Sequence, residues 1–344
     1  MVLAKRLLYV GSFFEGSTVN HRYYDFTQIF ESVDFFNTND YFPLFKRGFI
    51  SIWRKLECGP PFKKMYNSIL NKIEYFKPDV IFFDKSLYLP PSLLIELNKK
   101  GIFLIHFSND DQLNLKNQTK FYLESIPFYD IHLTTKSYNV FELLQLNAKE
   151  VIFVNNCTSK QFVYPLKLSK LDKERFYANI GFIGTWEKER AASLLFLAKN
   201  GIKIRIWGPG WINRPGLNHP NLIIENKVLW GADYLKAICS TNININFLRK
   251  ENRDLQTTRS IEIPACNAFM IAEFSEEHKN LFNENDEAVF FKSNEELLKK
   301  VEFYLENEKL RTIIARNSYN RCINSNYFYK ECFKKVFDKI LFEF

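Results

Sequence analysis

The sequence predicts an α/β protein of two domains, each built on a parallel sheet with helices on both faces. Continuous apolar runs of four to six residues recur along the chain and alternate with amphipathic stretches, which is the pattern of strands buried on both sides. The chain has 344 residues, more than one hydrophobic core usually serves. Its composition, 46% hydrophobic and 25% charged, excludes disorder and fibrous repeats.

The first half of the chain alternates strand and helix patterns. An apolar run at residues 7–10 ends at Gly11, and a polar loop over residues 11–20 leads to a helical stretch at 23–30. Later apolar runs predict further strands, with helices between several of them, at residues 78–83, 102–105, 131–133 and 151–154. Because parallel strands need a crossover connection, this alternation favours a parallel sheet.

A break in this rhythm marks the domain boundary. Residues 164–175 hold Pro165, mixed charges and few apolar side chains, so we place a first domain at 1–165 and a second at 166–328. The second domain repeats the pattern of the first, with strands expected at residues 180–184, 202–207, 222–224, 243–247, 268–272 and 288–291.

The last residues, 329–344, predict a helix that packs back on the first domain. Apolar side chains recur there at i, i+3, i+4, i+7, i+8 and i+11, counted from Phe333 to Phe344, and make one apolar stripe. A helix with such a face must dock on another element.

Charge and cysteine content limit the partners. The surplus of 47 Lys and Arg over 39 Asp and Glu is scattered among acidic residues and forms no stripe, so we expect no nucleic acid. The six cysteines lie far apart, without a C-x-x-C pair or a His at zinc-ligand spacing, so we expect no metal. Since the sequence has neither a long apolar run nor the apolar region of a signal peptide, we expect a cytoplasmic protein.

The most specific pattern lies in the second half. It reads R-x-x-E-x-P-A-C-x-x-F-M at 259–270 and L-F-x-x-x-x-E at 281–287, preceded by F-I-G-T at 182–185 and W-G-x-G-W at 207–211. In this order the pattern resembles the C-terminal domain of the CgeB-type group 1 glycosyltransferases. The first half resembles the family only through K-P-D at 77–79, N-D-D at 109–111 and Y-D at 129–130.

This resemblance implies a GT-B architecture, in which two Rossmann-like domains face a cleft and the C-terminal domain holds the donor. The implied enzyme is a glycosyltransferase that moves a sugar from a nucleotide-diphosphate sugar to a hydroxyl of a glycan or cell-surface precursor, with no further cofactor. A nucleotide-sugar epimerase or hydrolase stays open, because fold does not fix chemistry. A non-catalytic nucleotide- or glycan-binding protein also stays open, since Asn267 stands where the family usually has Gly, and Asp254 where it has Glu.

The resemblance assigns roles to two acids separated by seven residues. Glu262 would accept hydrogen bonds from the ribose hydroxyls, and Asp254 would lie near the sugar. A carboxylate suits a diol, because it can only accept hydrogen bonds and can take two of them. The alternative for Glu262 is an ordinary acid in the first turn of a helix.

A departing diphosphate needs positive charge and N–H groups around it. Any single cation in the sequence could equally be a surface or structural one. The candidates for the donor phosphates are Arg190, Arg259, Arg253, Arg249 and Lys250, with the turns at Gly184, Thr185, Gly208 and Gly11.

A dehydrogenase is disfavoured, because the loop after the first predicted strand is not G-x-G-x-x-G.

In the first domain, His106, Asp110 and Asp111 follow the strand predicted at 102–105 and are expected to face the cleft. An acid there could orient or deprotonate an acceptor hydroxyl. A buried His and a helix-capping Asp are the alternatives.

The basic and aromatic segment Phe45–Tyr66 could contact an anionic membrane, where a lipid-linked acceptor would be found. An amphipathic helix that covers the core, with Lys and Arg facing water, is the plainer interpretation.

Overall fold

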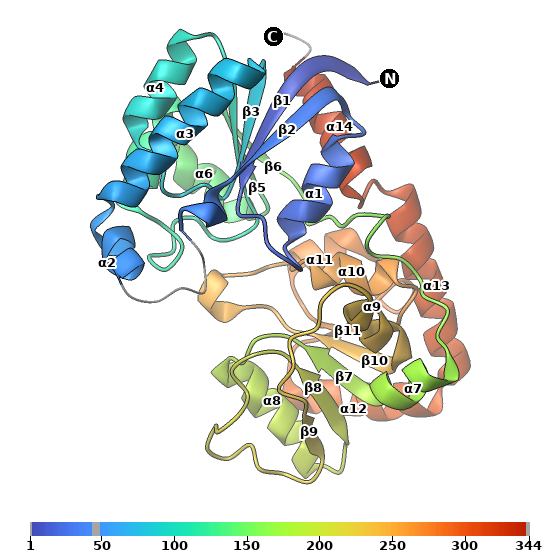
Figure 1. Ribbon diagram of the computed structural model, residues 1–344. Coiled ribbons are helices and arrows are strands. Elements are labelled where there is room, and N and C mark those ends of the chain that lie inside the picture. Colours follow the sequence, from blue (N-terminus) through green and yellow to red (C-terminus); the bar gives the residue numbers. More distant parts are fainter. Residues whose placement is uncertain (1, 43–48, 342–344) are drawn as a thin grey trace. The chain divides into compact units, whose positions relative to one another are not determined.

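The computed structural model describes residues 2–42 and 49–341, without the side chains of residues 49–51. By its contacts the chain divides into two compact units, Met1–Asn155 with Tyr329–Phe344, and Asn156–Phe328. Each unit holds a six-stranded sheet in which every strand pair is parallel (Figure 1). The α/β class predicted for both halves is therefore confirmed. Residues 45–48 of the predicted membrane segment, and Phe344 of the terminal stripe, lie outside the described residues.

The sheet of the first unit has the order β2-β1-β3-β4-β5-β6. Its central strands are the predicted apolar runs, but no strand was predicted at β2. As the edge strand, β2 is buried at only two of its eight positions and lacks a continuous apolar run. The strands are β1 Leu3–Gly11, β2 Phe30–Asn37, β3 Val80–Asp84, β4 Phe103–Ser108, β5 Ile131–Thr134 and β6 Val151–Phe153.

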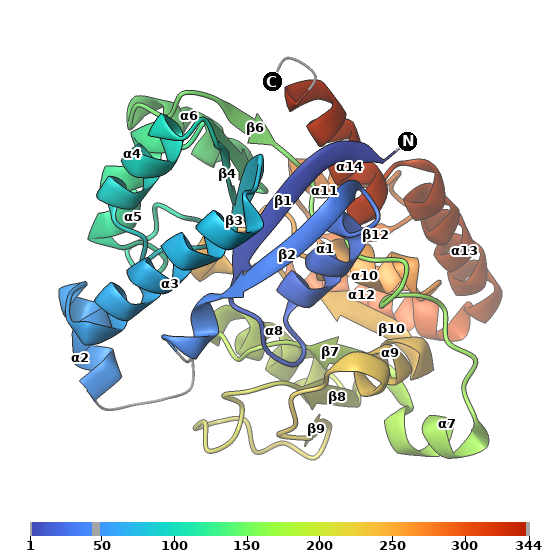
Figure 2. The same ribbon diagram turned by 45° about the horizontal axis from the view of Figure 1, so that its top comes forward.

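Helices cover both faces of this sheet (Figure 2). On one face, buried side chains of α3 and α4 join those of β1, β3 and β4 in one core. On the other face, α1 and α14 pack together against Phe82, whose ring lies 4.9 Å from Phe26 and 5.9 Å from Phe333. The helices are α1 Thr18–Phe26, α2 Phe49–Leu56, α3 Pro60–Phe76, α4 Pro91–Lys99, α5 Lys120–Ser125, α6 Ser137–Gln145 and α14 Tyr329–Ile340, with short 3-10 turns at Thr38–Asp40 and Ile126–Phe128.

A buried ion pair ties the terminal helix into this unit. Arg22 of α1, 2% exposed, pairs with Asp84 at the end of β3 over 2.7 Å and donates to the Tyr329 hydroxyl of α14 over 3.0 Å. The Tyr9 hydroxyl donates to the same carboxylate, so the charge of Asp84 is met from β1 and α1. A buried carboxylate needs such partners, since alone it would cost several kcal/mol.

The second unit has the strand order β12-β11-β10-β7-β8-β9, with α8 and α12 on one core cluster and α9, α10 and α11 on another. The strands are β7 Ala178–Ile183, β8 Ile204–Trp207, β9 Leu222–Ile224, β10 Thr241–Asn246, β11 Met270–Glu273 and β12 Val289–Phe291. The helices are α7 Lys170–Phe176, α8 Lys188–Lys199, α9 Gly231–Ser240, α10 Arg259–Ala265, α11 Glu276–Leu281, α12 Asn294–Glu306 and α13 Glu308–Asn324, with a 3-10 turn at Lys250–Asn252.

The strand order of the second unit locates its ligand site. The chain runs outward from β7 to β8 and β9, then returns to the other side of β7 with β10. In doubly wound sheets, ligands bind at the carboxyl ends of the strands, where the order reverses. The loops that follow β7 and β10 are therefore the place to look.

Within the described part of the chain, no cluster of His, Cys, Asp or Glu side chains is arranged to hold a metal ion. None of the helices described there has the length and apolar character needed to cross a bilayer.

Candidate active site in the second unit

Two glycines shape the loops beside the switch point. Gly208 has φ of +134°, and a Cβ there would lie 2.2 Å from the carbonyl oxygen of Gly184. The Gly184 N–H donates to Trp207 O over 2.8 Å, and the Gly208 N–H donates to Lys227 O over 3.0 Å. Both N–H groups are thus hydrogen-bonded within the protein and are not offered to a ligand. The missing side chain of Gly208 allows the loops after β7 and β8 to lie in contact.

Arg190, in the first turn of α8, joins the two switch-point loops. Its guanidinium donates to Thr185 O after β7 over 3.2 Å and lies 3.5 Å from Phe247 O after β10. The side chain is 3% exposed, and this burial lowers its pKa to about 10, partly opposed by Glu187. Arg190 therefore stays charged at neutral pH, in a position between the two loops.

Glu187 connects a second arginine to this corner. Its Oε1 lies 3.2 Å from Nε of Arg249 and 3.7 Å from a guanidinium nitrogen of Arg190. Arg259, at the start of α10, is close enough for its charge to lower the pKa of Arg190. Nε of Arg259 is buried and has no hydrogen-bond partner among the described residues. Three arginines thus gather at this corner. Glu187 pairs with two of them, Asp254 acts on the pKa of Arg190, and Arg259 acts on the pKa of Glu262. Guanidinium groups of this kind can bind a diphosphate.

Glu262, also on α10, lies beside this corner and is 7% exposed. The Tyr234 hydroxyl of α9 donates to its Oε2 over 2.6 Å. Burial raises the pKa of Glu262, while the Tyr234 hydrogen bond and Arg259 act in the opposite direction. Tyr234 is the one side-chain donor recorded for this carboxylate within the described residues, which leaves acceptor capacity for a diol.

Asp254 stands in the tight turn between β10 and α10. Asn252 donates to its Oδ1 over 2.6 Å, and its own N–H donates to Arg249 O over 3.0 Å. The preceding Arg253 is exposed and has a left-handed backbone with φ of +46°. Asp254 thus lies in the loop before α10 and Glu262 within that helix, and separate hydrogen bonds hold the two acids.

A buried polar network holds the start of α10 to the sheet. Ser260 Oγ lies 2.7 Å from His278 Nε2 and accepts from the Thr257 N–H over 2.9 Å, while Asn246 of β10 donates to it over 3.1 Å. Burial lowers the pKa of His278 to about 4, so the ring is neutral at neutral pH. Sequence reasoning missed this network, although Asn246 and Ser260, polar within apolar surroundings, were its signal.

Asn267 ends the same segment in a left-handed conformation, with φ of +53°. Its N–H donates to Pro264 O over 2.8 Å. Asn267 therefore makes a left-handed turn of the kind for which Gly is the usual residue.

The acids predicted for the acceptor side lie in the first unit, after β4. Asp110 pairs with Lys85, which follows the neighbouring strand β3. Asp111 is fully buried, where it accepts from Asn139 over 3.1 Å and from the Leu113 N–H over 3.2 Å. Asp111 therefore stabilises its own loop.

The expected position of His106 was wrong. Strand β4 continues to Ser108, so His106 lies inside the strand and is 1% exposed. Its ring packs against Tyr122, Tyr129 and His132, and burial lowers its pKa well below the usual value. Gly11 is the last residue of β1, as predicted, and a Cβ there would meet Val19 at 3.0 Å.

The chain resembles known proteins over part of its length by sequence and over nearly all of its length by structure. Residues 189–338 match the protein-family model described as "Glycosyl transferase-like". No curated protein matches the sequence significantly.

Sucrose-phosphate synthase from Thermosynechococcus elongatus superposes with a TM-score of 0.69 at 10% identity, over 99% of this chain and 100% of that one. HepE from Anabaena, in complex with UDP and glucose, gives 0.65 at 11% identity, over 99% and 100% of the chains. A putative UDP-N-acetylglucosamine 2-epimerase from Listeria monocytogenes gives 0.58 at 11% identity, over 99% and 97%.

These structural similarities confirm the predicted GT-B fold. The family match agrees with the predicted glycosyltransferase, while the nucleotide-sugar donor and the CgeB-type subgroup stay predictions. The chain thus has a GT-B fold, and its residues 189–338 are similar in sequence to glycosyl transferases.

Proposed function

We propose that this chain transfers a sugar from a nucleotide-diphosphate sugar, with a uridine nucleotide as the first candidate, to an acceptor hydroxyl. One observation carries the proposal: a buried carboxylate with spare acceptor capacity lies beside a cluster of arginines at the switch point of the second unit. A nucleoside diphosphate carries the matching groups, a ribose diol next to two phosphates. HepE, which has a similar fold, is known in complex with UDP and glucose.

In this proposal Glu262 accepts the ribose hydroxyls, with Tyr234 holding its other oxygen. Arg249 and Arg259 meet the charge that develops on the leaving diphosphate. Arg190 ties the start of the segment after β10, which carries both of them, to the loop after β7. Asp254 lies near the sugar. Positive charge fixed in place before the donor arrives stabilises the transition state without reorganising during the reaction.

The test is nucleotide binding by the full chain, measured as thermal shifts with UDP, GDP, ADP, dTDP and CMP, and with NAD as a control. A ligand at 100 times its dissociation constant adds about 2.7 kcal/mol of stability, enough to move the midpoint by several degrees. We expect one diphosphate to shift the midpoint and Glu262→Ala to abolish the shift. The exposed Glu302→Ala, on α12, is the matched control and should behave as the parent protein. A shift that survives Glu262→Ala would contradict the ribose assignment.

An epimerase is the second candidate function, favoured by the likeness to the Listeria protein named as a putative 2-epimerase. Incubation with UDP-sugars in the absence of any acceptor separates the two. An epimerase would convert the sugar nucleotide under these conditions, whereas a transferase needs an acceptor hydroxyl to turn over.

For the acceptor, we propose a glycan or a lipid-linked precursor of the cell surface, used by an enzyme in the cytoplasm. Asp110, paired with Lys85 after β3 and β4, is the acid that we propose to orient the acceptor hydroxyl. His106 is not included, because its ring is enclosed by three other rings.

A further inference from the structure

The corner between α2 and α3 of the first unit carries a surface that the donor chemistry does not use. We propose that this surface docks on an anionic lipid bilayer. The proposal deepens the proposed function, since it places the enzyme where a lipid-linked acceptor would be found. The corner surface consists of Ile52, Lys55, Leu56, Lys63, Lys64 and Asn67, all exposed.

Helix α2 presents one apolar and basic face to water. Ile52, Lys55 and Leu56 stand at i, i+3 and i+4 and so share one side of the helix. Ile52 is 52% exposed and Leu56 60% exposed. The neighbouring Trp53 packs against the core of the unit, and its ring fills the place that a Cβ of Gly59 would need, 2.3 Å away. This anchor fixes which side of α2 faces outward.

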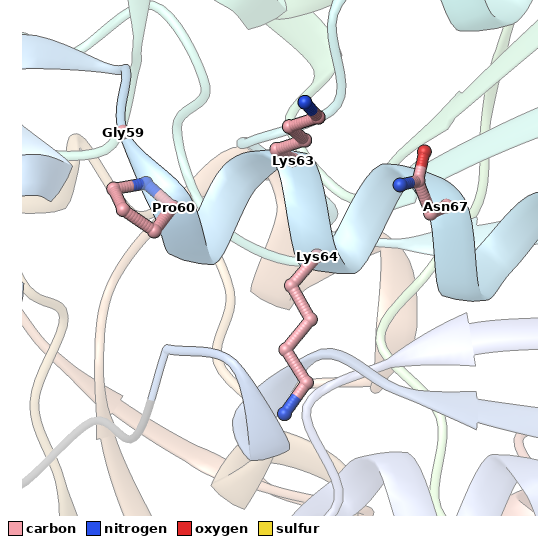
Figure 3. A pocket seen from close by; sticks show the side chains of 5 residues that line it. All are labelled: Gly59, Pro60, Lys63, Lys64 and Asn67. Carbon is pink, nitrogen blue, oxygen red and sulfur yellow. The ribbon is translucent and has the colours of Figure 1, made fainter.

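Helix α3 adds a basic pocket next to the turn. The pocket has a volume of about 680 Å³ and is lined by the turn Gly59-Pro60, Lys63, Lys64 and Asn67. Figure 3 shows the two lysines extending from the helix in different directions, with Asn67 one turn further along. Neither lysine forms an ion pair with any of the described residues. Their charge therefore acts on whatever lies outside the protein.

The acid inside this corner does not cancel the positive charge at its surface. Glu57, in the turn after α2, accepts the N–H groups of Lys120 and Phe121 over 2.6 and 2.7 Å. Its carboxylate is thus turned toward the start of α5. The three lysines of the corner surface keep a net positive charge, which complements anionic head groups.

The apolar side chains decide between a bilayer and other polyanions. A nucleic acid would use the lysines but leave Ile52 and Leu56 in water. In the head-group region of a bilayer, apolar side chains enter the acyl boundary while the lysine stems lie along it with their ammonium groups among the phosphates. Only the bilayer uses both halves of the surface.

Sedimentation of the full chain with vesicles tests the proposal. We expect binding to vesicles of phosphatidylcholine with phosphatidylglycerol, none to phosphatidylcholine alone, and weaker binding at high salt. The double variant Lys63→Gln with Lys64→Gln should bind about 30-fold more weakly, because each lysine near an anionic surface contributes about five-fold. Lys299→Gln with Lys309→Gln, two exposed lysines of the second unit, makes the same charge change and should bind as the parent protein.

A second variant tests the apolar half. Leu56→Ser keeps the charge and should weaken vesicle binding several-fold while leaving its salt dependence unchanged. Equal binding to both vesicle types, equal loss in the control pair, or binding to an RNA oligonucleotide as tight as to vesicles would overturn the proposal. Since neither donor nor acceptor is present in this assay, its result is independent of the nucleotide-binding test.

Discussion

Tyr234 holds the carboxylate that we propose for the ribose, and removing its hydroxyl tests the geometry of the donor site. Tyr234→Phe keeps the ring and deletes one donor, which bonds to Glu262 over 2.6 Å. A hydrogen bond to a charged group contributes about 1.5–3 kcal/mol. Because Glu262 is only 7% exposed, little water is available to replace that donor. The variant should therefore disfavour the charged form of Glu262.

The expected sign follows from the environment of the carboxylate. Burial already raises the pKa of Glu262, and the Tyr234 hydrogen bond and Arg259 limit that rise. Loss of the hydroxyl raises the pKa further. At about 1.36 kcal/mol per pH unit, the free energy of the hydrogen bond corresponds to a pKa rise of about one to two units. Only the ionised carboxylate accepts both ribose hydroxyls, so UDP affinity falls as the pH drops through this pKa. In Tyr234→Phe the fall begins at a higher pH.

Calorimetric titration with UDP over a series from mildly acidic to neutral pH measures this shift. The matched control is Tyr327→Phe in the same unit, whose hydroxyl donates to Leu281 O over 2.9 Å and has no place in the donor site. It should lose stability but keep the parent pH profile. Replacing UDP by 2′-deoxy-UDP should lower the affinity of Tyr234→Phe less than it lowers that of the parent protein. The reason is that the Tyr234 hydroxyl and the ribose 2′-hydroxyl both act on the Glu262 carboxylate, so their effects are coupled. Identical pH midpoints for variant and parent would refute the reasoning.

Three further predictions concern stability and the diphosphate. Asp84→Asn leaves the buried Arg22 without its counter-charge and should cost about 3–5 kcal/mol in urea unfolding. Gly208→Ala places a Cβ 2.2 Å from a carbonyl oxygen and should lower the melting midpoint and remove the nucleotide shift, whereas Gly216→Ala, with nothing within 4 Å, should cost only about 1 kcal/mol. Arg259→Lys should reduce the preference for UDP over UMP with the nucleotide-free midpoint unchanged, because lysine lacks the bidentate fork; an unchanged ratio would count against a phosphate contact.

The strands were predictable from the sequence, except for the edge strand β2. The runs that became β3 and β11 are apolar because both faces of a central parallel strand are covered. β2 has one neighbour and open positions, so charged and polar residues are accepted there and the run disappears. The same rule explains His106, where a polar residue suggested that the strand had ended. The three rings that enclose His106 come next to it only in the tertiary structure, so the sequence does not show them.

The donor-site candidates were predictable as residues but not as partners. Arg259 and Glu262 fall on one short helix, which their spacing already indicated. Tyr234 meets Glu262 across 28 residues, and Glu187 meets Arg249 across 62. Such contacts depend on which strands are neighbours in the sheet, and no local pattern contains that information.

The position of Arg190 changes the role that its motif suggested. A side chain that is 3% exposed, with its terminal nitrogens directed at Thr185 O and Phe247 O, would have to leave both carbonyls to grip a phosphate. Moving a buried cation away from its acceptors is costly, since the acceptors offset its desolvation. The lower cost is for Arg190 to stay in place. There its charge adds to the electrostatic potential of the corner, while its hydrogen bonds fix the loops after β7 and β10. We therefore propose that Arg249 and Arg259, and not Arg190, contact the diphosphate directly.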